Sequence, residues 1–129
     1  MNPRLSTGQV LELHEYLLSL DGGLPGVRDL GLLESALAQP CAEIFGELRS
    51  PTALEQACAY WFFLIKNHAF NDGNKRTATA CALLWLDLNG YALERPAEEI
   101  AAAAVSVAAD DWGYDQLLTW LRDQVRLFP

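Results

Sequence analysis

One ten-residue stretch, His68 to Thr77, brings several side chains that could do chemistry close together in the chain. It reads His-Ala-Phe-Asn-Asp-Gly-Asn-Lys-Arg-Thr, and so combines a potential base, a carboxylate, a small-residue turn and two cations. An imidazole titrates near neutral pH and can take a proton from an attacking hydroxyl. Protein-bound Mg²⁺ is held by one or two carboxylates together with phosphate oxygens and water. The stretch therefore indicates phosphate chemistry.

The residues after His68 suit an anion site. If a helix begins within the stretch, the backbone amides near Gly73, Asn74 and Lys75 point outward and form a concavity for anionic oxygens. Lys75 and Arg76 can neutralise phosphate charge, lysine as a point charge and arginine through a bidentate fork. Asp72 either caps the helix or binds Mg²⁺.

Taken one at a time these signals are weak. Asp-Gly-Asn is often only a turn, and Lys-Arg is often only a solvated pair, so the inference depends on their order and on the apolar helices on either side. Phe70 is expected to anchor the stretch to the core rather than to touch a substrate. The chain lacks the Gly-x-x-x-x-Gly-Lys loop of P-loop enzymes and the motifs of protein kinases. From the residues alone, phosphoryl transfer and nucleotidyl transfer both remain open.

Composition limits the other possibilities. The chain has 129 residues, 51% of them hydrophobic, which predicts a single compact domain over residues 1–129. Its net charge of -8, with bases scattered apart from Lys75-Arg76, argues against direct nucleic-acid binding. A basic protein partner would fit this charge, although it also serves solubility.

The cysteines and the termini point to an ordinary intracellular chain. The three cysteines, Cys41, Cys58 and Cys81, are widely spaced and form neither a disulfide framework nor a zinc motif. Cys58 and Cys81 lie on apolar helical faces and are expected to be buried hydrophobes. No signal peptide or membrane-spanning run is present, so we expect a cytoplasmic protein without a membrane contact.

The elements that must position the stretch are predicted to be helices. Ser6 and Gln9 form a capping box ahead of a helix from about Thr7 to Leu20, on which His14 is read as structural or semi-exposed rather than catalytic. Asp29 caps a short helix that ends before Pro40. A further short helical piece is expected near residues 42–48, followed by a loop.

The stretch itself lies between the two most apolar helical patterns. One helix opens at Pro51-Thr52 and ends at Lys66-Asn67, and the next runs from Thr77 to Leu88. Further helices are expected from about Pro96 to Ala109 and over residues 117–128, with a brief extended link at residues 91–93. No segment alternates with period two for long enough to indicate a sheet. The fold class is therefore all-α, a compact bundle of about six helices.

The pattern His68-x-Phe70-x-Asp72-Gly73-Asn74-Lys75-Arg76 resembles the signature loop of the Fic/Doc superfamily. The Lys75 variant is similar to the Doc branch, the death-on-curing toxins of bacterial toxin–antitoxin modules. The segment from Gly22 to Glu34 also resembles the Doc segment that follows the first helix. Together with the order of the helices, the resemblance covers most of the chain and implies an all-helical Fic-type fold.

The resemblance implies modification of a protein hydroxyl with ATP and Mg²⁺. By matching position, His68 is the general base, Asp72 the Mg²⁺ ligand, and Gly73, Asn74, Lys75 and Arg76 hold phosphates. AMP-transferring members typically carry glycine at the place of Lys75 and a second arginine at the place of Thr79. The residues at both positions differ here, as in Doc proteins, which are understood to bind the nucleotide in the opposite orientation from AMP-transferring members. Lys75 therefore joins His68 and Asp72 as a catalytic candidate and favours transfer of the γ-phosphate.

The resemblance also implies partners. The implied target is a threonine of elongation factor Tu, whose modification stops translation, and residues 40–51 lie where Fic proteins carry the flap that docks the target. No copy of the inhibitory helix motif is found, so restraint is expected from an antitoxin whose C-terminal segment folds into a groove. Two alternatives remain: an AMP transferase of a protein hydroxyl, and a catalytically idle Fic-fold binding module.

Overall fold

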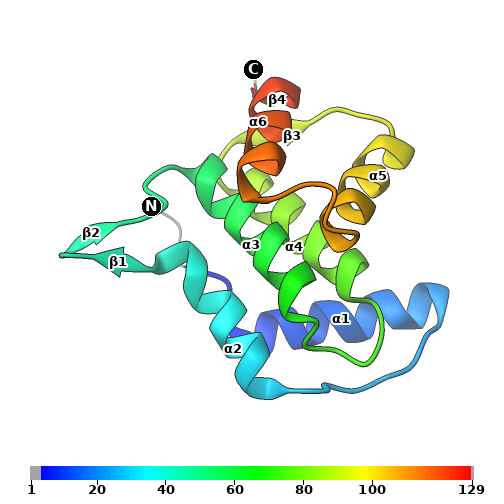
Figure 1. Ribbon diagram of the computed structural model, residues 1–129. Helices are drawn as coiled ribbons and strands as arrows, with labels where there is room; N and C mark the ends of the chain where they lie inside the picture. The colour runs from blue at the N-terminus through cyan, green and yellow to red at the C-terminus, as the bar shows by residue number, and fades with distance from the viewer. Residues whose placement is uncertain (1–3, 129) are drawn as a thin grey trace.

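The computed structural model describes residues 4–128, which form six α-helices and four short strands (Figure 1). The helices are α1 (Thr7–Asp21), α2 (Leu30–Ala38), α3 (Ala53–Asn67), α4 (Asn74–Leu88), α5 (Ala97–Ala108) and α6 (Tyr114–Gln124), with a 3₁₀ turn η1 at Gln39–Cys41. The strands are β1 (Glu43–Ile44), β2 (Glu47–Leu48), β3 (Tyr91–Leu93) and β4 (Val125–Leu127). The predicted helical fold, with six helices among the described residues, is confirmed.

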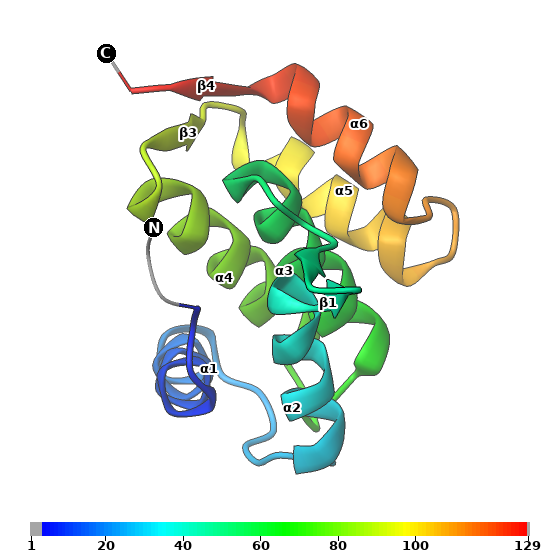
Figure 2. The ribbon, with the colours of Figure 1, turned by 90° about the vertical axis from the view of Figure 1, so that its left-hand side faces the viewer.

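The core is built around α3 and α4, which pack side by side and are joined by a short loop (Figures 1 and 2). Helices α1 and α2 cover one side of this pair, while α5 and α6 pack on the other. Both central helices bury small and large apolar side chains, including Tyr60 and Trp61 on α3 and Trp85 on α4. Because α3 and α4 pack against each other and against the surrounding helices, the two ends of the loop between them are fixed in position.

The predicted helix starts agree with the capping geometry. The side chain of Ser6 accepts from the amide of Gln9, and the Gln9 side chain accepts from the amide of Ser6, which completes the capping box of α1. Asp29 caps α2 and Thr52 caps α3, each through a side-chain oxygen that accepts a first-turn amide. These local signals place three helix starts correctly.

The prediction of a short helix near residues 42–48 is wrong. Strands β1 and β2 form an antiparallel hairpin there, with Glu43 opposite Leu48. The two residues between the strands, Phe45 and Gly46, have φ angles of 53° and 82°. Positive φ at both central positions is the geometry of the type I′ turn, which matches the twist of a hairpin and cannot continue a helix.

Two helix boundaries also differ from the prediction. The last helix ends at Gln124, and Val125–Leu127 instead pairs as β4 with β3, so the extended link predicted at residues 91–93 becomes half of a two-stranded sheet. Helix α4 begins at Asn74 rather than Thr77. The earlier start matters because it brings the N-terminus of α4 into the stretch from His68 to Thr77.

The predicted burial of Cys58 and Cys81 is confirmed. Cys58 and Cys81 are fully buried, and burial raises the pKa of each thiol to about 12, whereas Cys41 is exposed. No helix within residues 4–128 is both long enough and apolar enough to cross a membrane.

Candidate active site

The loop between α3 and α4 has a tightly defined backbone. His68 ends α3 in the left-handed conformation, with φ 49° and ψ 52°. Gly73 precedes α4 and is also left-handed, with φ 76°. Glycine adopts this conformation without steric cost, whereas a histidine there must be held by its surroundings.

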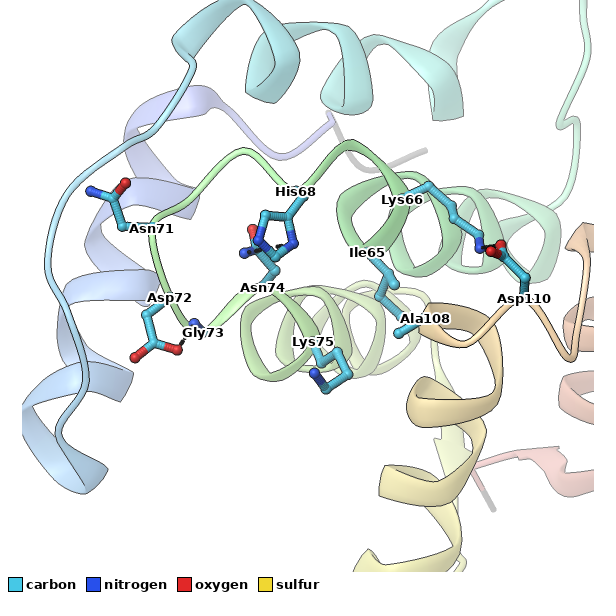
Figure 3. A pocket seen from close by; sticks show the side chains of 10 residues that line it. All are labelled: Ile65, Lys66, His68, Asn71, Asp72, Gly73, Asn74, Lys75, Ala108 and Asp110. Atoms are coloured by element: carbon cyan, nitrogen blue, oxygen red, sulfur yellow. Dashed lines mark hydrogen bonds and ion pairs between the residues drawn. The ribbon is translucent and has the colours of Figure 1, made fainter.

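A segment far away in the sequence holds this loop. Residues 23–29, which we call the strap, run alongside it (Figure 3). The amide of Arg28 donates to the carbonyl of Ala69 at 2.7 Å, and the amide of Asn71 donates to the carbonyl of Gly26 at 3.1 Å. The strap thus pairs with the loop as a strand would, and its ends reach the two residues predicted to do chemistry.

At one end, the strap fixes His68. The guanidinium of Arg28 donates to the carbonyl of His68 at 2.8 Å and to that of Asn67 at 3.2 Å. Carbonyls at a helix C-terminus lack partners within the helix, so Arg28 supplies the missing donors. No role of Arg28 could be predicted from its place in the chain, although it lies in the second segment that resembles the family, residues 22–34.

The side chain of Asn74 contacts the imidazole of His68. Its side-chain oxygen accepts the Phe70 amide at 2.9 Å and its Nδ2 donates to the Phe70 carbonyl at 3.0 Å, so the orientation of the amide is set. Nδ2 lies 3.3 Å from His68 Nδ1. This contact is a long hydrogen bond in which the amide nitrogen can only donate, and it helps to locate the ring. The Asn74 side chain therefore serves the loop, and a phosphate would meet its backbone amide.

At the other end, the strap fixes Asp72. Its Oδ2 accepts from the amide of Leu24 at 3.0 Å, and its Oδ1 accepts from the amide of Gly73 at 2.8 Å. These two bonds, and then the charge of nearby Arg76, lower the pKa of the exposed Asp72 carboxyl below its ordinary value. The carboxylate is therefore ionised at neutral pH and held in a defined orientation.

His14 supports the loop from the side of α1. It is buried, and its Nε2–H donates to the carbonyl of Asp72 at 2.8 Å. Its ring stacks on Phe70 with centroids 3.8 Å apart. The structural reading of His14 and the anchoring role of Phe70 are both confirmed, but the contact of His14 with the loop was not foreseen.

A pocket of about 540 Å³ opens beside the loop (Figure 3). His68, Asp72, Gly73, Asn74 and Lys75 line it together, so the structure brings five of the six predicted site residues to one cavity. The other lining residues are Ile65, Lys66, Asn71, Ala108 and Asp110. Two of these lining residues, Lys66 and Asp110, form an ion pair. The sequence alone does not reveal it, because Lys66 lies on α3 and Asp110 follows α5, far along the chain.

The sixth predicted residue, Arg76, lies in an adjoining pocket of about 440 Å³ that also contains Asp72 and Lys75. Its guanidinium donates to Asp21 at 3.3 Å and to the Gly22 carbonyl at 3.2 Å. Its Nε–H has no partner among residues 4–128. Arg76 therefore already uses two of its five N–H groups within the protein, on two different nitrogens, instead of presenting a wholly free fork.

The first turn of α4 can accept an anion. Among residues 4–128, the amides of Asn74, Lys75 and Arg76 donate to no backbone acceptor, as expected for the first positions of a helix. The exposed ammonium of Lys75 has no ion-pair partner in the same residues. Amides and ammonium together form a positive edge suited to phosphate.

The donor set also fits Mg²⁺. No group of three or more His, Cys, Asp or Glu side chains within residues 4–128 could hold a metal by itself. A lone ionised carboxylate beside a phosphate site is what Mg²⁺ uses, because phosphate oxygens and water supply its remaining ligands. Asp72 meets this requirement.

Fold and site together define a class: a mostly helical protein whose two central helices are joined by a pocket-lining loop that carries a histidine and a carboxylate. The model of the Fic/DOC family matches residues 4–86. This chain belongs to the Fic/DOC family.

Two curated relatives lie on the Doc side of the family. The chain is 46% identical over 72 residues to Toxin Doc of Mycolicibacterium smegmatis, an alignment that covers 56% of this chain and 55% of that protein. It is 32% identical over 119 residues to Protein kinase doc of Escherichia phage P1, which covers 92% of both chains. The chain thus spans about half the length of the first relative and nearly all of the second.

Proposed function

We propose that this protein is a toxin that transfers the γ-phosphate of ATP to a hydroxyl group of a protein target. The observation that carries the proposal is the convergence of His68, ionised Asp72 and the free amides of α4 on one pocket. The names of the two relatives, a Doc toxin and a Doc protein kinase, support the same activity.

Each pocket residue has its own role in the proposed phosphate transfer. A target hydroxyl beside His68 gives its proton to the imidazole as its oxygen bonds to the γ-phosphorus. The bond from the γ-phosphorus to the bridging oxygen breaks, and ADP leaves. The first-turn amides of α4 and the Lys75 ammonium stabilise the charge on the phosphoryl oxygens. Arg28 and Asn74 keep the imidazole in place.

Asp72 is the residue that would hold Mg²⁺, and the ion would neutralise phosphate charge when bound. The carboxylate can do this without reorganisation, because the amides of Leu24 and Gly73 already set its orientation. Both of its oxygens keep a further lone pair for a cation.

The partners follow from the toxin assignment. We propose elongation factor Tu as the protein target, which the exposed hairpin β1–β2 would help to dock. A cognate antitoxin would restrain the enzyme by folding its C-terminal segment into a groove of this domain. The net charge of -8 favours an antitoxin or a target with a basic face.

The test uses ATP labelled separately at the α and γ positions, with elongation factor Tu as the acceptor. We expect only the γ label to reach the target. His68→Ala and Asp72→Ala should each lower the rate by about a hundredfold or more, the usual scale for removing a general base or a metal ligand. Asp111→Ala, an exposed carboxylate outside the pocket, is the control and should leave the rate unchanged.

Other results would overturn parts of the proposal. Transfer of the α label alone would make the protein an AMP transferase. Full activity in both variants would remove His68 and Asp72 from the mechanism. If the purified protein modified nothing in a bacterial lysate and its expression without an antitoxin arrested no growth, it would be an idle binding module.

A further inference from the structure

His14 reaches the loop between α3 and α4 from helix α1, which passes close to that loop (Figure 1). Its side chain is buried, and its Nε2 lies 2.8 Å from the carbonyl oxygen of Asp72, a residue 58 positions further along the chain. A carbonyl oxygen can only accept a hydrogen bond, so Nε2 is the ring nitrogen that carries the proton. The imidazole is therefore a donor aimed at the backbone of the site.

The peptide group between Asp72 and Gly73 is held at both of its polar atoms. Its carbonyl accepts from His14, and its N–H donates to Asp72 Oδ1 at 2.8 Å. A peptide group is planar, so a bond that orients the carbonyl also orients the N–H. His14 thereby sets the direction of one of the two amides that hold the Asp72 carboxylate, although its own bond is to the backbone.

Other groups hold the rest of the loop backbone. The strap pairs with Ala69 and Asn71, and the side chain of Asn74 pairs with both backbone polar atoms of Phe70. Neither the strap nor Asn74 donates to the Asp72 carbonyl, and within residues 4–128 the bond to that carbonyl comes from the imidazole. The orientation of this one peptide group therefore depends on α1.

We infer that His14 is a positioning residue for the Asp72 carboxylate and acts through the Asp72–Gly73 peptide group. The inference rests on the proposed function, because that function gives Asp72 its role as the Mg²⁺ ligand. Groups behind a metal ligand orient it, and their loss typically lowers metal affinity about 10–100-fold. A purely structural histidine would affect only the stability of the fold.

The two contacts of His14 can be removed one at a time. Besides its bond to Asp72, the ring stacks on Phe70, with centroids 3.8 Å apart and planes 10° from parallel. His14→Phe keeps a flat ring over Phe70 and removes the donor. We expect it to raise the Kd for Mg-ATP about tenfold or more. The Kd for ATP in EDTA, which does not use the metal ligand, should stay within a few-fold, and calorimetry measures both.

His14→Gln is the matched rescue. Its side-chain Nε2 is separated from Cα by as many bonds as the imidazole Nε2, so this variant keeps a donor and loses the stack. We expect it to bind Mg-ATP within a few-fold of the parent protein. It should nevertheless unfold at a lower temperature than His14→Phe, because it buries an amide in place of an aromatic ring. A histidine that served stability alone would rank the two variants in the same order in both measurements.

Val10→Ala controls for loss of stability in α1. Val10 is buried one turn before His14, so the variant leaves a cavity in the core without removing a contact to the loop. It should unfold at a lower temperature than the parent protein and bind Mg-ATP with the same Kd.

A second readout needs neither nucleotide nor metal. The NMR shift of the Gly73 amide proton reports its bond to the Asp72 carboxylate. In His14→Phe this shift should move toward that of an amide bonded to water, whereas His14→Gln and Val10→Ala should keep the parent value.

Three results would each overturn the inference. They are a parent-like Kd for Mg-ATP in His14→Phe, an equal loss of Mg-ATP binding in His14→Gln or Val10→Ala, and a Gly73 shift that does not move in His14→Phe. A parent protein that binds Mg-ATP but transfers no phosphate would overturn the proposed function and leave this inference standing. A parent protein that binds no Mg-ATP would overturn both.

Discussion

At the scale of single residues, the site is held mainly by backbone atoms. The Asp72 carboxylate accepts hydrogen bonds from two backbone amides. The Arg28 side chain donates to the backbone carbonyl of His68, and the His14 side chain donates to that of Asp72. Hydrogen bonds to a carboxylate favour its ionised form, which is why the pKa of Asp72 is lowered. Asp72 therefore contributes to stability above its unfolded pKa and loses that contribution only as the pH falls through the lowered folded value.

Gly23 offers a test at this scale. It has φ +126°, and an added Cβ would lie 2.8 Å from Asp72 Oδ2 and 2.8 Å from Leu18 Cδ2. We expect Gly23→Ala to displace the carboxylate, to lower phosphate transfer about tenfold, and to raise the Mg²⁺ concentration needed for half-maximal activity. Kinetic titration with Mg²⁺ measures both effects.

Gly22→Ala is the matched control. Gly22 also has a positive φ, 77°, but an added Cβ meets nothing within 4 Å. Both variants should lose stability by roughly 1–3 kcal/mol from backbone strain. Only Gly23→Ala should change the Mg²⁺ dependence, and an equal change in both variants would show that strain rather than contact with Asp72 is responsible.

At the scale of elements, two short segments between the helices are important for the proposed function. The strap places the loop, and the hairpin β1–β2 projects from the helical body (Figure 1). Phe45 at its tip is fully exposed, with φ 53°. A large aromatic side chain that is both exposed and conformationally costly contributes little to folding, so we expect it to serve contact with the protein target.

Phe45→Asn tests this expectation. Asparagine tolerates the left-handed conformation, so the thermal stability should stay the same or rise slightly. Transfer to the protein target should fall about tenfold through a higher KM, the effect of losing an aromatic anchor, while the Kd for ATP stays constant. Tyr16→Asn, which removes an exposed aromatic on α1, is the comparison. Equal KM values for Phe45→Asn and the parent protein would exclude Phe45 from docking.

At the scale of the whole molecule, stability depends on the buried centre that α3 and α4 share. Cys58 and Cys81 lie in it, as does Tyr60, and Tyr114 packs against it. Burial raises the pKa of each thiol from 9.0 and of each phenol from 10.0 to about 12. The folded state therefore keeps these groups neutral where the unfolded chain would ionise.

This predicts how stability varies at alkaline pH. A group whose pKa is raised by folding contributes its full stabilisation below the unfolded pKa and loses it as the pH rises through the folded one. The free energy of unfolding should therefore be steady up to about pH 9 and fall progressively between about 9 and 12. Urea unfolding at a series of pH values measures it.

Thiol labelling provides the matched control. Exposed Cys41 should react with iodoacetamide in the folded protein, whereas Cys58 and Cys81 should react only after unfolding. Unfolding midpoints that do not change up to pH 11, or labelling of Cys58 in the folded protein, would contradict the account of the buried centre.

Much of the fold could be predicted because its signals are local. Ser6 with Gln9, Asp29 and Thr52 mark helix starts through contacts with residues three positions away, and the apolar spacing of α3 and α4 appears directly in the chain. The hairpin at residues 43–48 was missed because its two short strands carry no alternating pattern and its turn depends on the φ angles of Phe45 and Gly46. Strand β4 was missed because its partner β3 is distant in sequence.

The sequence by itself determined the order of His68, Asp72, Gly73 and Lys75 within one short stretch, and with it the expectation of phosphate chemistry, because these groups are neighbours in the chain. Only the tertiary structure decided how they are held and what surrounds them. The Arg28 bond to His68, the Leu24 and His14 bonds to Asp72 and the Lys66–Asp110 pair all join segments that are distant in sequence. Such contacts depend on how the helices pack, and packing is not encoded in the spacing of any single segment.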